Sequence, residues 1–202
     1  GLYDIALLQP VPGVVLMAPK DENELQHMVY TASRLERPVF VRFPKEPGRG
    51  VPLDPEFREI PLGRGEILRR GDRVLVLAVG PLVARALDAA DALSREDGIE
   101  ATVVNVRFLK PLDRDLILQQ AAAAGLVVTV EDGALRGGFA GVVRAELEAG
   151  GFAGRFLALG VGEDDLPLGS RAELLALCGL DAGGIRRSVR EFVKGSQVPD
   201  RS

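Results

Sequence analysis

Short apolar runs alternate with longer segments of helical spacing from residue 66 to about residue 194, and this alternation limits the chain to few folds. The apolar runs, which we expect to be buried strands, lie at 73–79, 101–108, 126–130 and 156–159. The helical segments are expected at 81–94, 113–124, 139–149, 170–177 and 181–194. Strands separated by helices of this length form a parallel sheet with helices on both faces. The sequence therefore predicts an α/β fold.

A smaller unit precedes this alternation. Apolar runs at 14–17 and 39–41 are expected to be strands, and the segment 22–34 between them has helical spacing. Asp21 and Glu24 have the spacing of a capping box at the start of that helix. Strand, helix and strand in this order form a right-handed βαβ unit with parallel strands. One such unit is too small to hold a core alone, so we expect a remnant of a larger sheet whose other strands lie outside this chain.

Residues 44–65 separate the two units. Prolines and glycines are dense in this segment and regularly spaced apolar residues are few, which is typical of an extended linker that lies over a surface. We therefore divide the chain into the end of one domain at 1–43, a linker at 44–65, a second domain at 66–195 and a tail at 196–202.

Composition and charge exclude two kinds of partner. The formal net charge is -4 and the lysines and arginines are scattered, whereas nucleic-acid binding requires a basic stripe. The longest apolar runs fall far short of the roughly 20 residues of a membrane-spanning helix, so a membrane is not expected as a partner either. The single cysteine, Cys178, cannot form an internal disulfide, which favours a cytoplasmic location, and we expect its thiol to be buried and structural.

Residues suited to catalysis are few. His27 is the only histidine, and its place beside the apolar stripe of the segment 22–34 predicts a position at the surface or at the boundary of the core. Glu131 and Asp132 end a central strand, where open α/β sheets place functional groups. These two carboxylates could transfer protons, bind a cation, cap the following turn or lie at a subunit contact. The glycines at 137–138 open a helix, and they either leave its N–H groups free for an anion or allow close helix–sheet packing.

A basic cluster is the more specific signal. Arg42 and Lys45 lie at the carboxyl end of the strand expected at 39–41, where the chain leaves the βαβ unit. Cations at such a strand end suit an anionic substrate group, and phosphate is the commonest one. The alternative is a solvated ion pair between Lys45 and Glu46, and the spacing alone favours neither interpretation.

Seven segments carry a resemblance to a known family. They are MAPKDENEL at 17–25, VRFP at 41–44, VVNVRFLKPLD at 103–113, TVED at 129–132, GGFAG at 137–141, GSRAELL at 169–175 and GLDA at 179–182. In this order they resemble the 1-deoxy-D-xylulose-5-phosphate synthase family over nearly the whole chain. The resemblance implies a transketolase-like C-terminal domain, preceded by a βαβ remnant of the pyrimidine-binding domain.

Members of this family are thiamin diphosphate-dependent transferases of the methylerythritol phosphate pathway. They condense pyruvate with glyceraldehyde 3-phosphate, release carbon dioxide and form a precursor of isoprenoids and of thiamin. The resemblance implies that this chain is the C-terminal portion of such an enzyme, a cytoplasmic homodimer that requires thiamin diphosphate and Mg²⁺. The ligands of both cofactors belong to the N-terminal remainder, so we expect the chain alone to be inactive. The alternatives are a non-catalytic scaffold or interaction module, or the equivalent part of another transketolase or of a pyruvate dehydrogenase β-type enzyme.

The resemblance also implies roles for single residues. Lys45 falls where the family has a phosphate-binding arginine, so Lys45, with Arg42 nearby, is the expected ligand of the acceptor phosphate. Lysine keeps the charge but loses the bidentate fork of arginine, and Glu46 beside it would compete with the phosphate. The family's substrate-site histidine would fall just ahead of Gly1, and no catalytic residue, cofactor ligand or metal ligand is expected within this chain. The stretch 160–169 departs from the loop of the family at that place.

Overall fold

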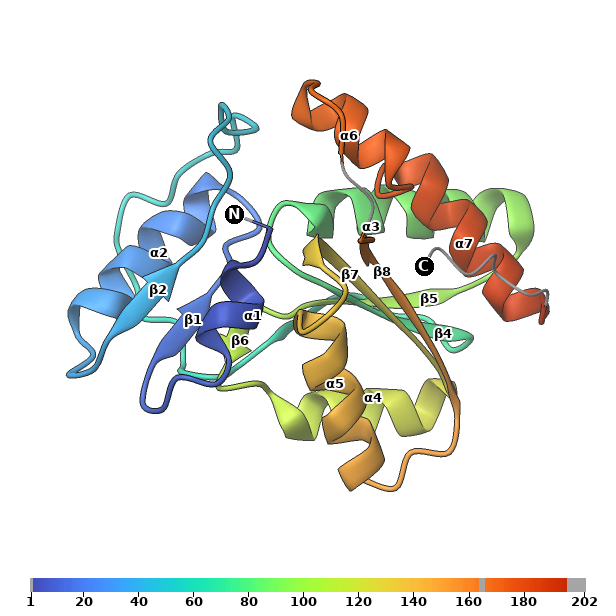
Figure 1. The fold of residues 1–202 in the computed structure, drawn as a ribbon, viewed down its shortest axis with the longest axis horizontal. Helices are drawn as coiled ribbons and strands as arrows, with labels where there is room; N and C mark the ends of the chain where they lie inside the picture. Colours follow the sequence, from blue (N-terminus) through green and yellow to red (C-terminus); the bar gives the residue numbers. More distant parts are fainter. Residues whose placement is uncertain (1, 164–165, 196–202) are drawn as a thin grey trace.

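The computed structural model describes residues 2–163 and 166–195, so the tail expected at 196–202 lies outside the described residues. The strands of its larger sheet are β3 (Glu66–Arg69), β4 (Val74–Ala78), β5 (Ala101–Asn105), β7 (Leu126–Ala134) and β8 (Arg155–Val161). They lie in the order β3-β5-β4-β7-β8, and Figure 1 labels all of them except β3. β4 pairs in parallel with β5 and β7, and β7 pairs in parallel with β8. The predicted parallel sheet of an α/β fold is confirmed for these strands.

One edge of this sheet differs from the prediction. β3 pairs antiparallel with β5 and was not predicted as a strand. All residues of β3 are only partly buried, and charged residues flank Ile67 and Leu68, so they do not form the apolar run that marks the other strands. An antiparallel edge strand tolerates such a sequence, whereas β4 and β5 are buried along their whole length and require apolar residues.

Helices cover both faces of the larger sheet, as predicted (Figure 1). On one face lie α3 (Leu82–Ala92), followed by the short π-helix Leu93–Asp97, and α7 (Ala182–Lys194), and on the other lie α4 (Arg114–Ala124) and α5 (Phe139–Ala149). Successive residues of β4 point to opposite faces, so Val76 packs in the core with the first helices and Leu77 with the second. Among the described residues, no helix combines the length and the apolar character that crossing a membrane requires.

Several helices begin at residues whose side chains cap them, at the starts of the predicted helical segments. Asp113 and Asp181 each accept a backbone N–H in the first turn of α4 and of α7. Ser170 and Glu173 form a reciprocal capping box at the start of α6 (Arg171–Leu177). These side chains satisfy N–H groups that have no partner within the helix, which is why the sequence alone located the helix starts.

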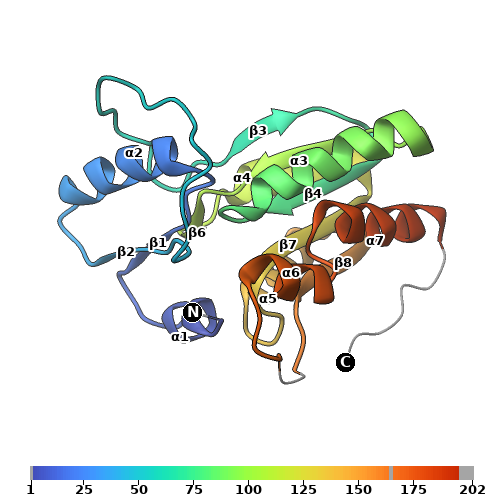
Figure 2. The ribbon, with the colours of Figure 1, turned by 90° about the horizontal axis from the view of Figure 1, so that it is seen from above.

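The smaller unit contains a second sheet. β1 (Val15–Met17) and β2 (Val39–Val41) pair in parallel through α2 (Glu22–Ser33), so the predicted βαβ unit is confirmed. The other edge of β1 pairs antiparallel with β6 (Phe108–Lys110), which gives the order β2-β1-β6. Figure 2 shows this sheet beside the larger one, with the short helix α1 (Asp4–Leu8) next to it.

The pairing of β6 corrects one expectation. The run at 101–108 was predicted as one strand, but the chain turns at Arg107, whose φ is +61°, and its two halves enter different sheets. β6 also gives β1 a partner on its second edge, whereas β2 lies at the edge of this sheet and pairs only with β1 among the described strands. A left-handed conformation is uncommon for a residue with a side chain, so contacts of Arg107 must hold it.

The carboxylate of Glu24 makes the central contact at this turn. Glu24 is 3% exposed and accepts hydrogen bonds from Nδ2 of Asn105 (2.8 Å) and Nε of Arg107 (2.7 Å). It also accepts the N–H of Lys20 (2.7 Å), whereas the predicted capping box would direct it to the N–H of Asp21. Only half of that box is present, because Asp21 does accept the N–H of Glu24 (2.7 Å). Glu24 instead joins the smaller unit to β5 and β6.

The segment 44–65 packs over α2 and buries its histidine. His27 is 3% exposed, its Nε2 lies 2.8 Å from Oδ2 of Asp54, and its Nδ1 accepts the N–H of Arg58 (3.2 Å). The hydroxyl of Thr31 accepts the N–H of Ile60 (2.9 Å). The expectation of a surface or boundary histidine was wrong, because it rested on the helix alone and could not include the segment that covers it.

Removal of the Glu24 carboxylate should destabilise the fold strongly. Glu24→Ala leaves the buried amide of Asn105 without this acceptor and Arg107 with Glu66 alone, and an unsatisfied buried polar group costs about 1–3 kcal/mol. Glu36→Ala, at an exposed position just beyond the same helix, should change the free energy of unfolding by less than about 0.5 kcal/mol. Denaturant titrations of both variants measure the difference, and equal values would contradict the role of Glu24.

Candidate functional site

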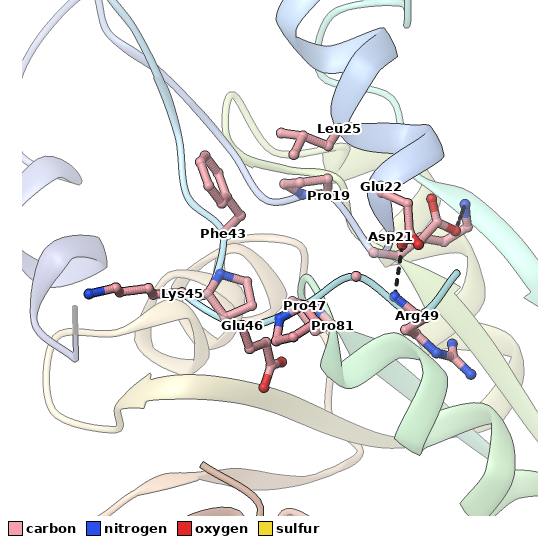
Figure 3. Close-up of a pocket in the computed structure, with 13 residues that line it drawn as sticks. Pro19, Asp21, Glu22, Leu25, Phe43, Lys45, Glu46, Pro47, Arg49 and Pro81 are labelled. Carbon is pink, nitrogen blue, oxygen red and sulfur yellow. Dashed lines mark hydrogen bonds and ion pairs between the residues drawn. The ribbon is translucent and has the colours of Figure 1, made fainter. Parts of the chain in front are cut away.

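Two adjoining cavities share a wall where the smaller unit meets the larger sheet. The first, of about 540 Å³, lies between the start of α2 and residues 43–49 (Figure 3). The second, of about 640 Å³, is lined by residues of α1, β2, β7 and α6. Phe43, Pro44, Lys45 and Pro81 line both cavities. The turn that follows β2 therefore forms the wall between them.

Lys45 is an exposed cation on this wall. Among the described residues it has no hydrogen bond or ion pair. Figure 3 shows its ammonium group extended away from the carboxylate of Glu46. Glu46 instead accepts a hydrogen bond from Nη1 of Arg171 (2.7 Å). The alternative in which Lys45 pairs with Glu46 is therefore not observed.

Arg42 lines the second cavity, and two carboxylates engage it. Its Nε donates to Asp4 (2.9 Å) and its Nη1 donates to Asp132 (2.8 Å). Burial of the guanidinium, which is 13% exposed, would lower the pKa of Arg42, but Asp132 and Asp4 outweigh this effect and raise it. Of the two predicted phosphate ligands, Lys45 is thus the one whose charge no contact offsets in the described part of the chain.

Arg42 belongs to a series of alternating charges, which we name the ion-pair chain. Its members, in order of contact, are Asp4, Arg42, Asp132, Arg171 and Glu46. Arg171 donates to Asp132 (2.5 Å) as well as to Glu46. Burial acts to raise the pKa of Asp132, but Arg42 and Arg171 lower it below its usual value. The ion-pair chain links the turn after β2 to β7 and to the start of α6.

Sequence reasoning found only part of this arrangement. Arg42, Lys45 and Asp132 were candidates, and the structure brings all three to the second cavity. Arg171 was not a candidate, because it begins a helix far along the chain and no local pattern connects it to the others. Cys178, expected to be buried, is only partly buried and lines the same cavity.

Glu131, the neighbour of Asp132 on β7, has a different role. It is 0% exposed, and its two oxygens accept the N–H groups of Phe139 and Ala140, both at 2.8 Å, at the start of α5. Burial raises the pKa of Glu131 to about 7, although these two hydrogen bonds and the charge of Arg42 act to lower it. Of the roles considered for this carboxylate, capping of the following segment is the one that the structure confirms.

The glycines at 137–138 permit this contact. A Cβ atom on Gly138 would lie 2.5 Å from Oε2 of Glu131 and 2.2 Å from the carbonyl oxygen of Ala134. The anion at the start of α5 is therefore a side chain of the protein itself, and it reaches the helix only because no Cβ is in the way. The N–H groups of Phe139 and Ala140 are thus not free for another anion, and the close-packing interpretation of these glycines is the one that the structure supports.

The acidic groups near the cavities do not fit a magnesium-bound diphosphate. In the part of the chain that the structure describes, no cluster of three or more histidine, cysteine or acidic side chains could hold a metal ion. Glu22, beside the first cavity, accepts the backbone N–H groups of residues 49–51 at 3.2, 2.5 and 3.0 Å. Asp132, beside the second, binds two arginines. Near the two cavities, the charge available to a ligand is therefore the ammonium group of Lys45 and not these carboxylates.

The buried carboxylate of Glu131 should make stability depend on pH. In the unfolded chain Glu131 loses its proton near pH 4.5, and in the folded protein near about 7, so between these values only the folded state holds the proton. The free energy of unfolding should therefore fall as the pH rises through this window, by on the order of 3 kcal/mol. Glutamine does not ionise, so in Glu131→Gln the free energy of unfolding should not show this decrease between the two pKa values. Denaturant titrations across the window test it, and parallel curves for the two proteins would refute it.

Family models match both units of the chain. The model described as the transketolase pyrimidine binding domain matches residues 1–49, and the model described as the transketolase C-terminal domain matches residues 63–185. The chain is 46% identical over 202 residues to 1-deoxy-D-xylulose-5-phosphate synthase 1 of Geobacter sulfurreducens, covering 98% of this chain and 32% of the relative. The synthase of Heliobacterium modesticaldum is 47% identical over 192 residues, covering 95% and 30%. The chain thus spans about a third of the length of these curated relatives.

Solved structures agree with these matches. The chain resembles a structure described as a split gene transketolase, inactive β4 tetramer, with a TM-score of 0.83 and 32% identity, covering 98% of this chain and 62% of that one. Transketolase from Campylobacter jejuni, 15% identical, has the same fold, with a TM-score of 0.66 over 96% of this chain and 28% of its own. The C-terminal domain model matches more than half of the residues of this chain, and the chain therefore belongs to the transketolase family.

Proposed function

We propose that this chain is the C-terminal portion of a 1-deoxy-D-xylulose-5-phosphate synthase, which condenses pyruvate with glyceraldehyde 3-phosphate and releases carbon dioxide. The observation that carries the proposal is Lys45, a cation without a partner among the described residues, on the wall between two cavities. It stands where the resemblance places a phosphate-binding residue. In this proposal Lys45 binds the phosphate of the acceptor, and Arg42, whose charge Asp4 and Asp132 offset, holds the strand end from which Lys45 projects.

Identity to relatives supports a synthase over the alternatives. The chain is 46% and 47% identical to the synthases of Geobacter sulfurreducens and Heliobacterium modesticaldum, but 32% identical to the split gene transketolase. The equivalent part of another transketolase or of a pyruvate dehydrogenase β-type enzyme is therefore less well supported. A non-catalytic scaffold or interaction module has no observation in its favour.

The chemistry of the reaction depends on groups outside this chain. In the whole enzyme, thiamin diphosphate with Mg²⁺ would supply decarboxylation and storage of the resulting carbanion, and residues of the N-terminal remainder would hold both. We further propose a homodimer and a cytoplasmic location, as the resemblance implies. The N-terminal remainder is then the essential partner of this chain.

The contribution of this chain would be to position the acceptor. A phosphate held at Lys45 fixes one end of glyceraldehyde 3-phosphate, so its aldehyde carbon meets the donor with little loss of rotational freedom in the transition state. Binding energy from a part of the substrate that does not react can be used in this way. The ion-pair chain stiffens the wall that carries Lys45, which keeps this anchor at a constant place.

The chain alone should not catalyse the reaction. Incubated with pyruvate, glyceraldehyde 3-phosphate, thiamin diphosphate and Mg²⁺, it should form no product, because the proposed cofactor ligands belong to the remainder of the enzyme. Mass spectrometry of the mixture measures this, and the full-length protein under the same conditions is the positive control. Steady product formation by the chain alone would overturn the division of roles proposed here.

Lys45→Ala in the full-length enzyme should weaken the binding of glyceraldehyde 3-phosphate and leave the binding of pyruvate unchanged. A charge-assisted contact contributes about 1.5–3 kcal/mol, so the KM for glyceraldehyde 3-phosphate should rise about tenfold to a hundredfold. The KM for pyruvate should hardly change, since pyruvate carries no phosphate. Lys45→Arg should leave the acceptor KM unchanged or lower it, because arginine restores the bidentate contact to phosphate. Steady-state kinetics with each substrate varied in turn gives both constants.

Lys194→Ala is the matched control for the loss of one lysine. Lys194 is an exposed lysine in the last turn of α7 and is not among the residues that line the two cavities. Its replacement should change neither KM. If Lys45→Ala behaves like Lys194→Ala, the acceptor phosphate does not bind at Lys45.

A further inference from the structure

We propose that Arg171 is a positioning residue of the phosphate site: it holds the carboxylate of Glu46 and thereby keeps Lys45 available to the acceptor phosphate. The inference rests on the proposed function of Lys45 and adds to it a residue that the resemblance does not assign. In the sequence, the anionic side chain of Glu46 directly follows Lys45, the cation proposed to bind the phosphate.

Glu46 can weaken the site in two ways. Its carboxylate can pair with the ammonium group of Lys45, or it can repel a phosphate that approaches, because like charges a few ångströms apart oppose each other. In the structure Nη1 of Arg171 donates to Oε1 of Glu46 (2.7 Å), and the side chains of Lys45 and Glu46 point apart (Figure 3). The charge of Glu46 is thus offset by a cation other than Lys45.

The start of α6 gives Arg171 a fixed place. Arg171 is the first residue of that helix and directly follows Ser170, whose capping box with Glu173 defines the helix start. A cation at this end opposes the helix dipole, so the helix itself gives no reason for an arginine there. The contacts of Arg171 with Asp132 and Glu46 do give one.

The guanidinium group suits a contact with two carboxylates. Its two terminal nitrogens are divided between them: Nη2 donates to Asp132 (2.5 Å), which is 14% exposed, and Nη1 donates to Glu46. Asp132 is itself held by Arg42 on its other oxygen (2.8 Å). Arg171 is therefore anchored on the β7 side and reaches Glu46 with its remaining arm. A lysine, with one ammonium group on a flexible stem, would not divide its donors in this fixed way.

The test uses Arg171→Gln, Glu46→Gln and the double variant in the full-length enzyme. Arg171→Gln releases the carboxylate of Glu46 and should raise the KM for glyceraldehyde 3-phosphate about threefold to tenfold, as expected for coupled neighbouring charges. The kcat and the KM for pyruvate should stay unchanged. Glu46→Gln added to Arg171→Gln removes the released charge, so the acceptor KM should return to within about twofold of the wild-type value. A purely structural role of Arg171 would give no such rescue.

Two results overturn the inference. One is an unchanged acceptor KM in Arg171→Gln, and the other is a raised KM that Glu46→Gln does not relieve. The proposed function is judged separately by Lys45→Ala in the same assay: if that variant raises the acceptor KM and Arg171→Gln does not, the positioning role fails and the phosphate site stands. If Lys45→Ala has no effect, the phosphate site itself fails.

Arg114→Gln is the matched control for Arg171→Gln. Arg114 also forms an ion pair with a glutamate, Glu146 (2.9 Å), but the pair joins α4 and α5, which cover the face of the larger sheet opposite α3 and α7 (Figure 1). Its loss should leave both KM values unchanged. Melting temperatures of all variants show whether a change of KM accompanies a loss of folded protein. If Arg171→Gln does not fold, Glu46→Gln alone still tests the inference. Removal of the Glu46 charge should not raise the acceptor KM, and a raised value would contradict the proposed role of Arg171.

Discussion

Arg107 turns the chain between β5 and β6, and its guanidinium group lies between the carboxylates of Glu24 (2.7 Å) and Glu66 (2.6 Å). Through this turn, one run of residues contributes a strand to each sheet. The carboxylate of Glu24 is buried, and a buried charge is stable only when it is paired, so the position of α2 and β1 against the larger sheet depends on this contact. An apolar cluster that contains Leu16 and Leu77 fills the space beside it.

The site is a product of this docking. Both cavities open where the smaller unit meets the larger sheet, and neither unit alone would provide all of their walls. Asp132 lies between Arg42 of the smaller unit and Arg171 of the larger one, so a single carboxylate serves both. The same contacts that fix the two units relative to each other therefore also fix the turn that carries Lys45.

The charge pattern at this turn shows how the proposed phosphate site would tolerate a neighbouring carboxylate. Asp4 and Asp132, which line the second cavity, each accept a hydrogen bond from an arginine, and so does Glu46, which lines the first. Lys45 lies at the edge of that pattern and not within it. A ligand phosphate would then meet a positive charge that is not already offset, in a wall whose other charges are paired.

The sequence by itself determined the α/β class, the βαβ unit and the helix starts, because these follow from local periodicity and from caps such as Asp113 and Ser170. The sequence also placed Lys45 near the carboxyl end of β2, because the apolar run before it predicts where that strand ends. The break at Arg107 and the burial of His27 could not be read, because both depend on segments far along the chain. The partner of Glu46 was decided by tertiary structure alone: Arg171 lies 125 positions away, and only the docking of the two units brings the two charges into contact.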